Sequence, residues 1–186
     1  METDVNHYVV IDLEATTSSN GSLPKDEMET IEIGAVFVDA SDLSVVGEFQ
    51  TFIRPMQHPQ LLPFYTELTT ITQSMIDDAP IFPSALADLV RHIVTPFSTT
   101  RFCSWGLFDK TQFERDCAFH EIAYPLPEHI NLKDQFSKTQ GKRRTYAMSE
   151  ALKICGVELD GTHHRGIDDA RSITKLLPWI VGENRI

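Results

Sequence analysis

The chain has 186 residues, of which 41% are hydrophobic and 23% are charged, and its formal net charge at pH 7 is −11. This length and composition indicate one globular domain with a sizeable core rather than a disordered chain. The acidity argues against a protein that coats nucleic acid, because that binding needs many Lys and Arg contacts with phosphates, but it allows an enzyme that binds a few nucleotides at one site.

Three strands are predicted first along the chain. The apolar run HYVVIDL (7–13) contains the β-branched residues typical of a buried strand. The segments ETIEIGAVFVDA (29–40) and SVVGEFQTFIRP (44–55) predict a second and a third strand, joined by a hairpin. The polar segment 14–28 between the first two strands is expected to form a loop.

Helices and further strands are predicted in the rest of the chain, with loops and short helices over 56–82. The later elements are a helix over 83–94 with Ser84 as N-cap, a strand over 101–105, a helix over 109–122 capped by Asp109, a short strand within 129–134, a helix over 145–156 ended by Gly156, and a helix over 167–181 bent or shortened at Pro178. Successive strands followed by strands alternating with helices predict an α/β fold with a mixed sheet. Sites in such folds lie at strand ends.

Neither a membrane segment nor a disulfide framework is expected. No apolar run approaches the roughly 20 residues that span a bilayer, and the start METDVNHYVV lacks the features of a signal peptide. Cys103, Cys117 and Cys155 are far apart and form no C-x-x-C, which favours buried thiols over disulfides or structural zinc. We therefore expect a cytoplasmic protein without membrane contact.

Asp12 and Glu14 end the first predicted strand. Side chains alternate across a strand, so the two acids share a face, with Cα atoms about 7 Å apart. Two anions at the edge of a core repel each other, and no Lys or Arg occurs between Asn6 and Pro24 to pair with them. A bound Mg²⁺ or Mn²⁺ would relieve the repulsion. The alternative is a strand that ends early and leaves both acids in solvent.

A second group of polar residues lies in THHRGIDDAR (162–171), at the start of the last predicted helix. The aspartates there could simply complement the helix dipole, and the histidines could be exposed loop residues. Gly166, however, permits a tight turn that brings His164 back towards Asp169. A neutral imidazole in that position would be a good general base near pH 7.

Asp109 provides a third acid at a predicted strand end, where capping of the following helix is the alternative role. Acids from three separate segments, together with one histidine, are typical of two-metal phosphoryl transfer. In that chemistry the cations orient water and stabilise the leaving oxygen, and the histidine takes the proton from the attacking water.

The motifs DLEAT, WGLFD and HHRGIDDA resemble, in that order, the three exonuclease motifs of the DEDDh superfamily of 3′→5′ exonucleases. The segments FIRPMQHPQLLPFYTELTTITQSMIDDAP and KRRTYAMSEALKICGVELDGTHHRGIDDA resemble the Eri-type group, which includes histone mRNA 3′-end exonucleases and bacterial relatives. The resemblance implies an RNase H-like α/β fold, with a mixed five-stranded sheet flanked by helices, in a single exonuclease domain over 1–186 with its core at about 8–177.

The resemblance also assigns metal-site acids to four positions: Asp12, Glu14, Asp109 and Asp169. It implies two Mg²⁺ or Mn²⁺ ions, with Asp12 bridging both. Glu14 and Asp169 would help to hold the ion that activates water, and Asp109 would serve the other, directly or through water.

The general base of the family falls on His164. Its spacing to Asp169 is the one that defines the family subtype, which favours this pair over the neighbouring His163 and Asp168. A zinc hydrolase that uses the two adjacent histidines is a weaker alternative, because they lack the i, i+4 spacing of a helical zinc pair.

The resemblance places a 3′-terminal nucleotide at the end of the first strand. Backbone N–H groups near Ala15 would reach its 3′-hydroxyl, and Leu13, Trp105 and Phe108 would pack on the sugar or base. Stacking of this kind tolerates any base. The alternative is that the two aromatic residues belong to the core.

Arg143 lies in the densest basic stretch, KTQGKRR (138–144), which either contacts the phosphate backbone or is a solvated loop. The leading interpretation is a metal-dependent 3′→5′ exonuclease that acts on single-stranded RNA or DNA 3′ ends and releases nucleoside 5′-monophosphates, with RNA favoured by the resemblance alone. A DNA exonuclease of the proofreading or repair type and a catalytically inactive adaptor with the same fold are the alternatives. The oligomeric state is left open.

Overall fold

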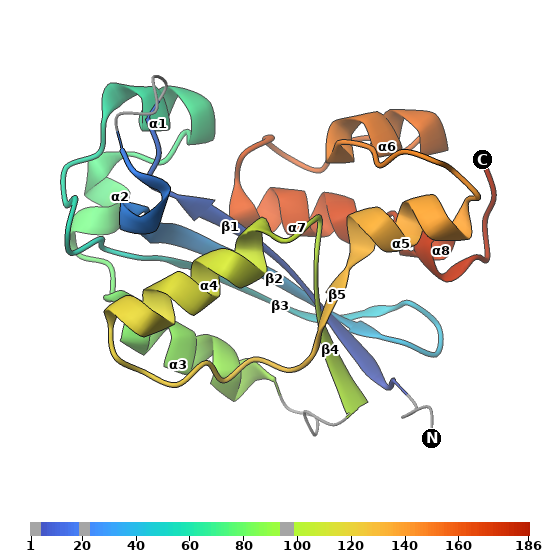
Figure 1. Ribbon diagram of the computed structural model, residues 1–186, viewed down its shortest axis with the longest axis horizontal. Coiled ribbons are helices and arrows are strands. Elements are labelled where there is room, and N and C mark those ends of the chain that lie inside the picture. Colours follow the sequence, from blue (N-terminus) through green and yellow to red (C-terminus); the bar gives the residue numbers. More distant parts are fainter. Residues whose placement is uncertain (1–4, 19–22, 94–98) are drawn as a thin grey trace.

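A five-stranded mixed sheet in the order β3-β2-β1-β4-β5 forms the centre of the protein (Figure 1). The computed structural model describes residues 5–18, 23–93 and 99–186. The strands are β1 (His7–Ala15), β2 (Thr30–Asp39), β3 (Val45–Phe52), β4 (Thr100–Ser104) and β5 (His129–Asn131). β2 is antiparallel to both β1 and β3, whereas β4 runs parallel to both β1 and β5. This arrangement confirms the predicted mixed sheet.

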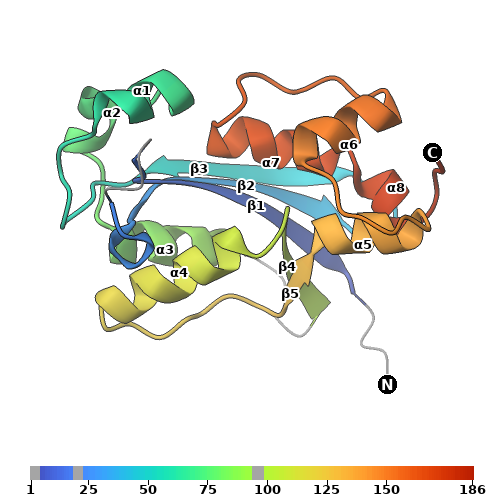
Figure 2. The ribbon, with the colours of Figure 1, turned by 45° about the horizontal axis from the view of Figure 1, so that its top comes forward.

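Helices cover both faces of the sheet, with α3 and α4 below it and α7 above it in Figure 2. The helices are the 3₁₀ helix η1 (Lys25–Glu27), α1 (Pro63–Thr69), α2 (Gln73–Asp77), α3 (Phe82–His92), α4 (Phe108–Phe119), α5 (Leu132–Thr139), α6 (Met148–Cys155), α7 (Gly166–Thr174) and α8 (Leu177–Val181). None of these helices, within the described part of the chain, is long and apolar enough to cross a membrane.

β1 has a continuous apolar run because helices cover the sheet on both sides of it. Val9 and Ile11 pack into the cluster that includes residues of α3 and α4, while Val10 packs into the cluster on the α7 side. Asp12 and Glu14 follow Val10 at intervals of two residues and therefore lie on the α7 face. The alternation that builds the core thus directs both acids towards the start of α7.

Two of the predicted helix caps are wrong, because both helices begin earlier than expected. The N-cap of α3 is Ile81, and Ser84 lies in the first turn, where its N–H donates to the Ile81 carbonyl. The N-cap of α4 is Leu107 rather than Asp109. The Asp109 carboxylate is in the first turn and accepts a hydrogen bond from the backbone of Leu13, so it connects the helix to β1.

The predicted strand within 129–134 ends at Asn131, where α5 begins. The Asn131 side chain caps α5 by accepting from the backbone N–H groups of the second and third helical residues. The predicted helix 167–181 is divided into α7 and α8, with Pro178 in the first turn of α8. Val94, at the end of the predicted helix 83–94, lies outside the described residues.

Gly34 in β2 and Gly166 at the start of α7 allow the sheet and the helix to meet backbone to backbone. Gly34 is the cross-strand partner of Asp12. A Cβ atom at Gly34 would lie 2.1 Å from the carbonyl carbon of Gly166, and one at Gly166 would lie 2.9 Å from the Asp12 carbonyl oxygen. The close approach places the first turn of α7 directly beside Asp12.

The Gly34→Ala variant is expected to lose roughly 3 kcal/mol of unfolding free energy, the upper end of the usual cost of overpacking, because the added methyl group meets backbone atoms that cannot rotate away. Gly47→Ala in β3 is the matched control, since a Cβ atom there would meet the Phe37 ring at an ordinary 3.6 Å. Denaturant unfolding of both variants measures the difference. Equal stability of the two variants would contradict the close approach.

Candidate active site

A cleft of about 270 Å³ opens where β1 ends. The residues that line it are Asp12, Leu13, Glu14, Trp105, Phe108, Asp109, Met148, His163, His164 and Asp169. The structure therefore brings together the four predicted acids and both histidines from β1, α4, α7 and the loop before α7. Three of the predicted substrate contacts also line the cleft, whereas Ala15 and Arg143 do not.

Three of the acids form a compact set of oxygen ligands. Asp12, Glu14 and Asp169 each offer one carboxylate oxygen, and these oxygens lie within 4.8 Å of one another. Glu14 is 9% exposed and Asp169 is 4% exposed, so little water reaches their side chains. Asp109 is equally buried and lines the same cleft. Carboxylate oxygens converging in this way are the donor set that a hard divalent cation prefers.

The pKa values of these acids reflect the repulsion among them. Burial, followed by the charge of Asp169, raises the pKa of Glu14 to about 8. Burial raises the pKa of Asp109 to about 6, although hydrogen bonds, chiefly from backbone N–H groups, oppose the rise. Burial and the charge of Asp109 also raise the pKa of Asp12 well above its usual value. A bound cation would remove the cost of ionising all of them, so the residues present fit a metal ion.

Asp109 is held in place by a contact with β1. Its Oδ1 accepts from the backbone N–H of Leu13 at 3.0 Å. Ser104, at the end of β4, is fully buried, and its hydroxyl donates to the Gly106 carbonyl at 3.2 Å and hydrogen-bonds Nε2 of His129 at 2.9 Å. No pattern in the sequence predicts Ser104 or His129 near the site, because their contact forms only when β4 and β5 pair.

The two histidines stack on each other beside Asp169, with ring centroids 4.0 Å apart. The Asp169 carboxylate accepts from the backbone N–H of His164 and contacts Nδ1 of His163, both at 3.0 Å. Ligand atoms of these three residues also lie within 4.8 Å of one another. Burial and the neighbouring His163 lower the pKa of His164, which favours the neutral imidazole that a general base requires.

The predicted substrate contacts differ in their surroundings. The Trp105 side chain lines the cleft and also packs on the core, and its indole N–H donates to the Tyr146 carbonyl at 3.0 Å. Phe108 is 44% exposed at the cleft. Arg143 is exposed in the loop after α5, and Ala15 is buried and pairs with the first residue of β2.

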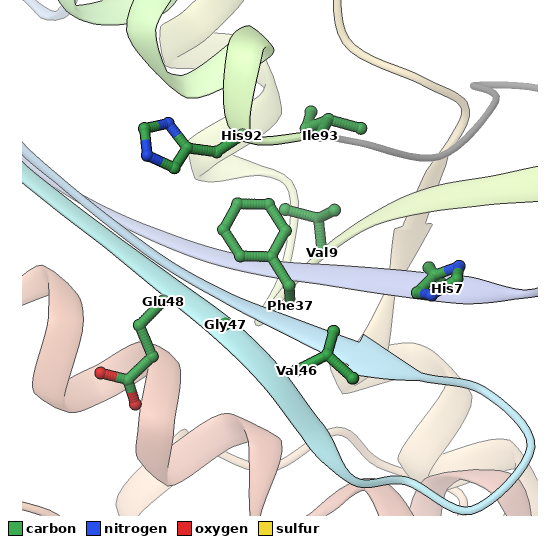
Figure 3. A pocket seen from close by; sticks show the side chains of 8 residues that line it. All are labelled: His7, Val9, Phe37, Val46, Gly47, Glu48, His92 and Ile93. Carbon is green, nitrogen blue, oxygen red and sulfur yellow. The ribbon is translucent and has the colours of Figure 1, made fainter.

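A second cavity, of about 200 Å³, lies towards the opposite end of β1 and is shown in Figure 3. Phe37, Val9 and Ile93 contribute apolar side chains to it, and the carboxylate of Glu48 is directed to the other side of the sheet (Figure 3). Glu48 is the one acid among the described residues that line this cavity. The cavity therefore lacks the converging carboxylates of the cleft, and we assign no chemistry to it.

Comparison with known proteins gives a family match over most of the chain. The family model described as "Exonuclease" matches residues 9–177. The chain is 28% identical over 196 residues to "ERI1 exoribonuclease 2" of Homo sapiens, covering 94% of this chain and 28% of that protein. It is 28% identical over 179 residues to "Probable 3'-5' exonuclease KapD" of Bacillus subtilis (strain 168), covering 94% of this chain and 84% of that protein.

The fold also matches solved structures. The nuclease domain of 3'hExo, described as a DEDDh family member bound to rAMP, aligns with a TM-score of 0.84 at 24% identity over 99% of this chain and 96% of that one. This likeness confirms the predicted exonuclease fold, and the sequence matches confirm the resemblance to Eri-type enzymes and a bacterial relative. The chain spans 28% of the human relative's length and thus corresponds to one part of that protein.

Proposed function

The chain belongs to the exonuclease family, and from this premise we propose that it is a metal-dependent 3′→5′ exonuclease that hydrolyses single-stranded RNA to nucleoside 5′-monophosphates. The observation that carries the proposal is the convergence of the Asp12, Glu14 and Asp169 oxygens within 4.8 Å of one another, in a cleft that Asp109 also lines. RNA is preferred to DNA because the human relative is named an exoribonuclease.

The four acids would hold two Mg²⁺ or Mn²⁺ ions, with Asp12, Glu14 and Asp169 as the central set and Asp109 completing it. When bound, divalent cations supply positive charge that stabilises a phosphodiester transition state and favours deprotonation of water. The positive charge of the cations would offset the negative charge of the carboxylates. This would account for so many buried carboxylates in one place, since without a cation they repel each other.

His164 is proposed to accept the proton of the attacking water at a ring nitrogen. Asp169 fixes the backbone of His164, which holds the imidazole at the cleft. Leu13 and Phe108 would pack on the 3′-terminal sugar and base, with Trp105 completing the wall of the cleft.

Two outer contacts complete the proposed substrate site. Backbone groups near Ala15 would reach the 3′-hydroxyl. Arg143 is exposed in the loop that also contains Tyr146, and this loop reaches the cleft because the Tyr146 carbonyl accepts a hydrogen bond from Trp105. Arg143 would therefore contact a phosphate upstream of the cut. We place this exonuclease core at about 8–177 and the enzyme in the cytoplasm.

Incubation with 5′-labelled single-stranded RNA and DNA oligomers of the same sequence tests this function. With Mg²⁺ or Mn²⁺ we expect a ladder that shortens from the 3′ end, faster for RNA than for DNA, and no shortening in EDTA. Faster hydrolysis of DNA would instead support a DNA exonuclease. Binding without any shortening in either metal would support an inactive adaptor and contradict the proposal.

A further inference from the structure

Glu32 is a fifth carboxylate near the cleft, and its contacts distinguish it from the four proposed metal ligands. It is fully buried in β2, where it is the cross-strand partner of Glu14. Its two oxygens accept hydrogen bonds from the guanidinium of Arg165 at 3.1 and 3.2 Å, from the backbone N–H of Gly166 at 3.0 Å and from the side-chain amide of Gln50. Both oxygens of Glu32 are therefore already occupied.

Arg165 is enclosed on several sides. Its side chain is 17% exposed and forms the ion pair with Glu32. The guanidinium carbon lies 5.3 Å from the centre of the Phe52 ring, at the end of β3, and Nη1 lies 3.5 Å from the Thr70 hydroxyl, just after α1. A planar guanidinium with these partners has little freedom to move, and lysine cannot reproduce its paired hydrogen bonds.

These contacts fix the start of α7. The N-cap residue, Arg165, makes no side-chain capping bond, and the backbone N–H of Gly166 at the first helical position is satisfied by Glu32 from the neighbouring strand. We call the contacts of Glu32 with Arg165 and Gly166 the anchor. His164 immediately precedes Arg165, and Asp169 follows Gly166 within the first turn of α7. The anchor thus sets where the proposed base and one proposed metal ligand lie relative to β1.

We infer that Glu32 and Arg165 are positioning residues, which hold the segment from His164 to Asp169 against the end of β1 so that the acids and the histidine converge. The inference rests on the proposed function for the meaning of that convergence, and it assigns neither residue to the metal or to the substrate. Outer contacts that orient metal ligands commonly change metal affinity or activity by about 10- to 100-fold when they are removed.

A second ion pair between α7 and the sheet provides a matched control. Arg171 in α7 contacts Glu48 in β3 through Nε at 3.1 Å and Nη2 at 2.6 Å, so this pair has the same two-bond geometry. Both side chains are more than one-third exposed, and neither lines the cleft. Glu48→Gln removes only this arginine–glutamate contact, whereas Arg171→Gln also removes the contact of Arg171 with Asp168 at 3.2 Å; neither variant changes the contacts of Glu32 and Arg165.

The test compares Arg165→Gln, Arg165→Lys and Glu32→Gln with the control variants Arg171→Gln and Glu48→Gln. Two measurements are made in folded protein: the Mn²⁺ response, which is the Mn²⁺ dissociation constant fitted to the rise of melting temperature with Mn²⁺ concentration, and kcat and KM on a single-stranded RNA oligomer. We expect Arg165→Gln to raise the Mn²⁺ dissociation constant about tenfold and to lower kcat by about 10- to 100-fold, with KM little changed.

Arg165→Lys should recover part of the loss, because it keeps the charge but not the paired hydrogen bonds. The two control variants should match the wild type in both measurements.

Glu32→Gln preserves volume and one acceptor, so it tests the anchor if Arg165→Gln does not fold. Variants that melt earlier but keep the wild-type Mn²⁺ response and kcat would overturn the inference and leave a purely structural role. A wild-type protein without exonuclease activity would refute the proposed function instead, while the Mn²⁺ response would still report on the anchor.

Discussion

The Asp12→Asn variant is expected to lose exonuclease turnover by at least about 10³-fold, because charge stabilisation by a bound metal ion contributes several kcal/mol to the transition state. Asp12 lies at the centre of the site: its oxygen is within 4.8 Å of those of Glu14 and Asp169, and its pKa is raised by burial and by the charges of four neighbouring acids. Asparagine keeps the shape and one neutral oxygen but removes the charge. Single-turnover assays with saturating Mn²⁺ and labelled RNA measure the effect.

The stability of the same variant separates a lost ligand from a damaged fold. Because one repelling charge is removed, metal-free Asp12→Asn should melt at a higher temperature than the metal-free wild type near pH 8, and Mn²⁺ should stabilise it less. Asp26→Asn, in the exposed helix η1, is the control and should behave as the wild type in both assays. A well-folded Asp12→Asn protein with normal turnover would show that Asp12 is not part of the catalytic site.

The metal-free protein is expected to become less stable as the pH rises from about 5 to 8, and saturating Mn²⁺ should remove most of that loss. In EDTA the folded state keeps a proton on Glu14 up to about pH 8, whereas the unfolded chain releases it near the ordinary value of 4.5. The contribution of Glu14 to the stability of the folded protein is therefore fully present below its pKa in the unfolded chain. It is lost as the pH rises through its pKa in the folded protein. For this group alone, the two pKa values correspond to on the order of 4 kcal/mol.

Urea unfolding at several pH values, with EDTA and with Mn²⁺, measures this dependence. The gap in unfolding free energy between the two conditions should widen towards pH 8, because the cation holds the carboxylates ionised and binds only the folded state. Glu14→Gln should reduce the dependence in EDTA, since glutamine has no proton to release, and the raised pKa values of Asp12 and Asp109 should account for a remainder. A metal-free protein that gains stability over this pH range would contradict the raised pKa values.

Much of the fold follows from local patterns in the sequence. The apolar run that forms β1 predicts a central strand, and its alternation correctly places Asp12 and Glu14 on one face. Gly156 ends α6 in the left-handed conformation, as its position predicts. The helix α5 is not predicted even though Leu132 and Phe136 have helical spacing, because the polar residues between them resemble a loop.

The parts of the site that were not predicted depend on contacts between distant segments. Glu32 and Arg165 are 133 residues apart, and only the packing of α7 on β2 brings them together. From the sequence alone, Gly34 is a glycine inside a strand with no evident role. The structure shows that the backbone of Gly166 packs directly against it. The hydrogen bond from the backbone of Leu13 to Asp109, an acid that the sequence does predict at the site, likewise cannot be inferred from neighbouring residues.

The acids of the cleft come from opposite ends of the chain, with Asp12 in the first strand and Asp169 in the next-to-last helix. During synthesis on a ribosome, the early strands emerge long before α7 is available to dock on them. A nascent chain therefore has no assembled cleft until α7 has been synthesised. The order of the elements makes the assembly of the cleft a late event relative to the formation of the hairpin between β2 and β3.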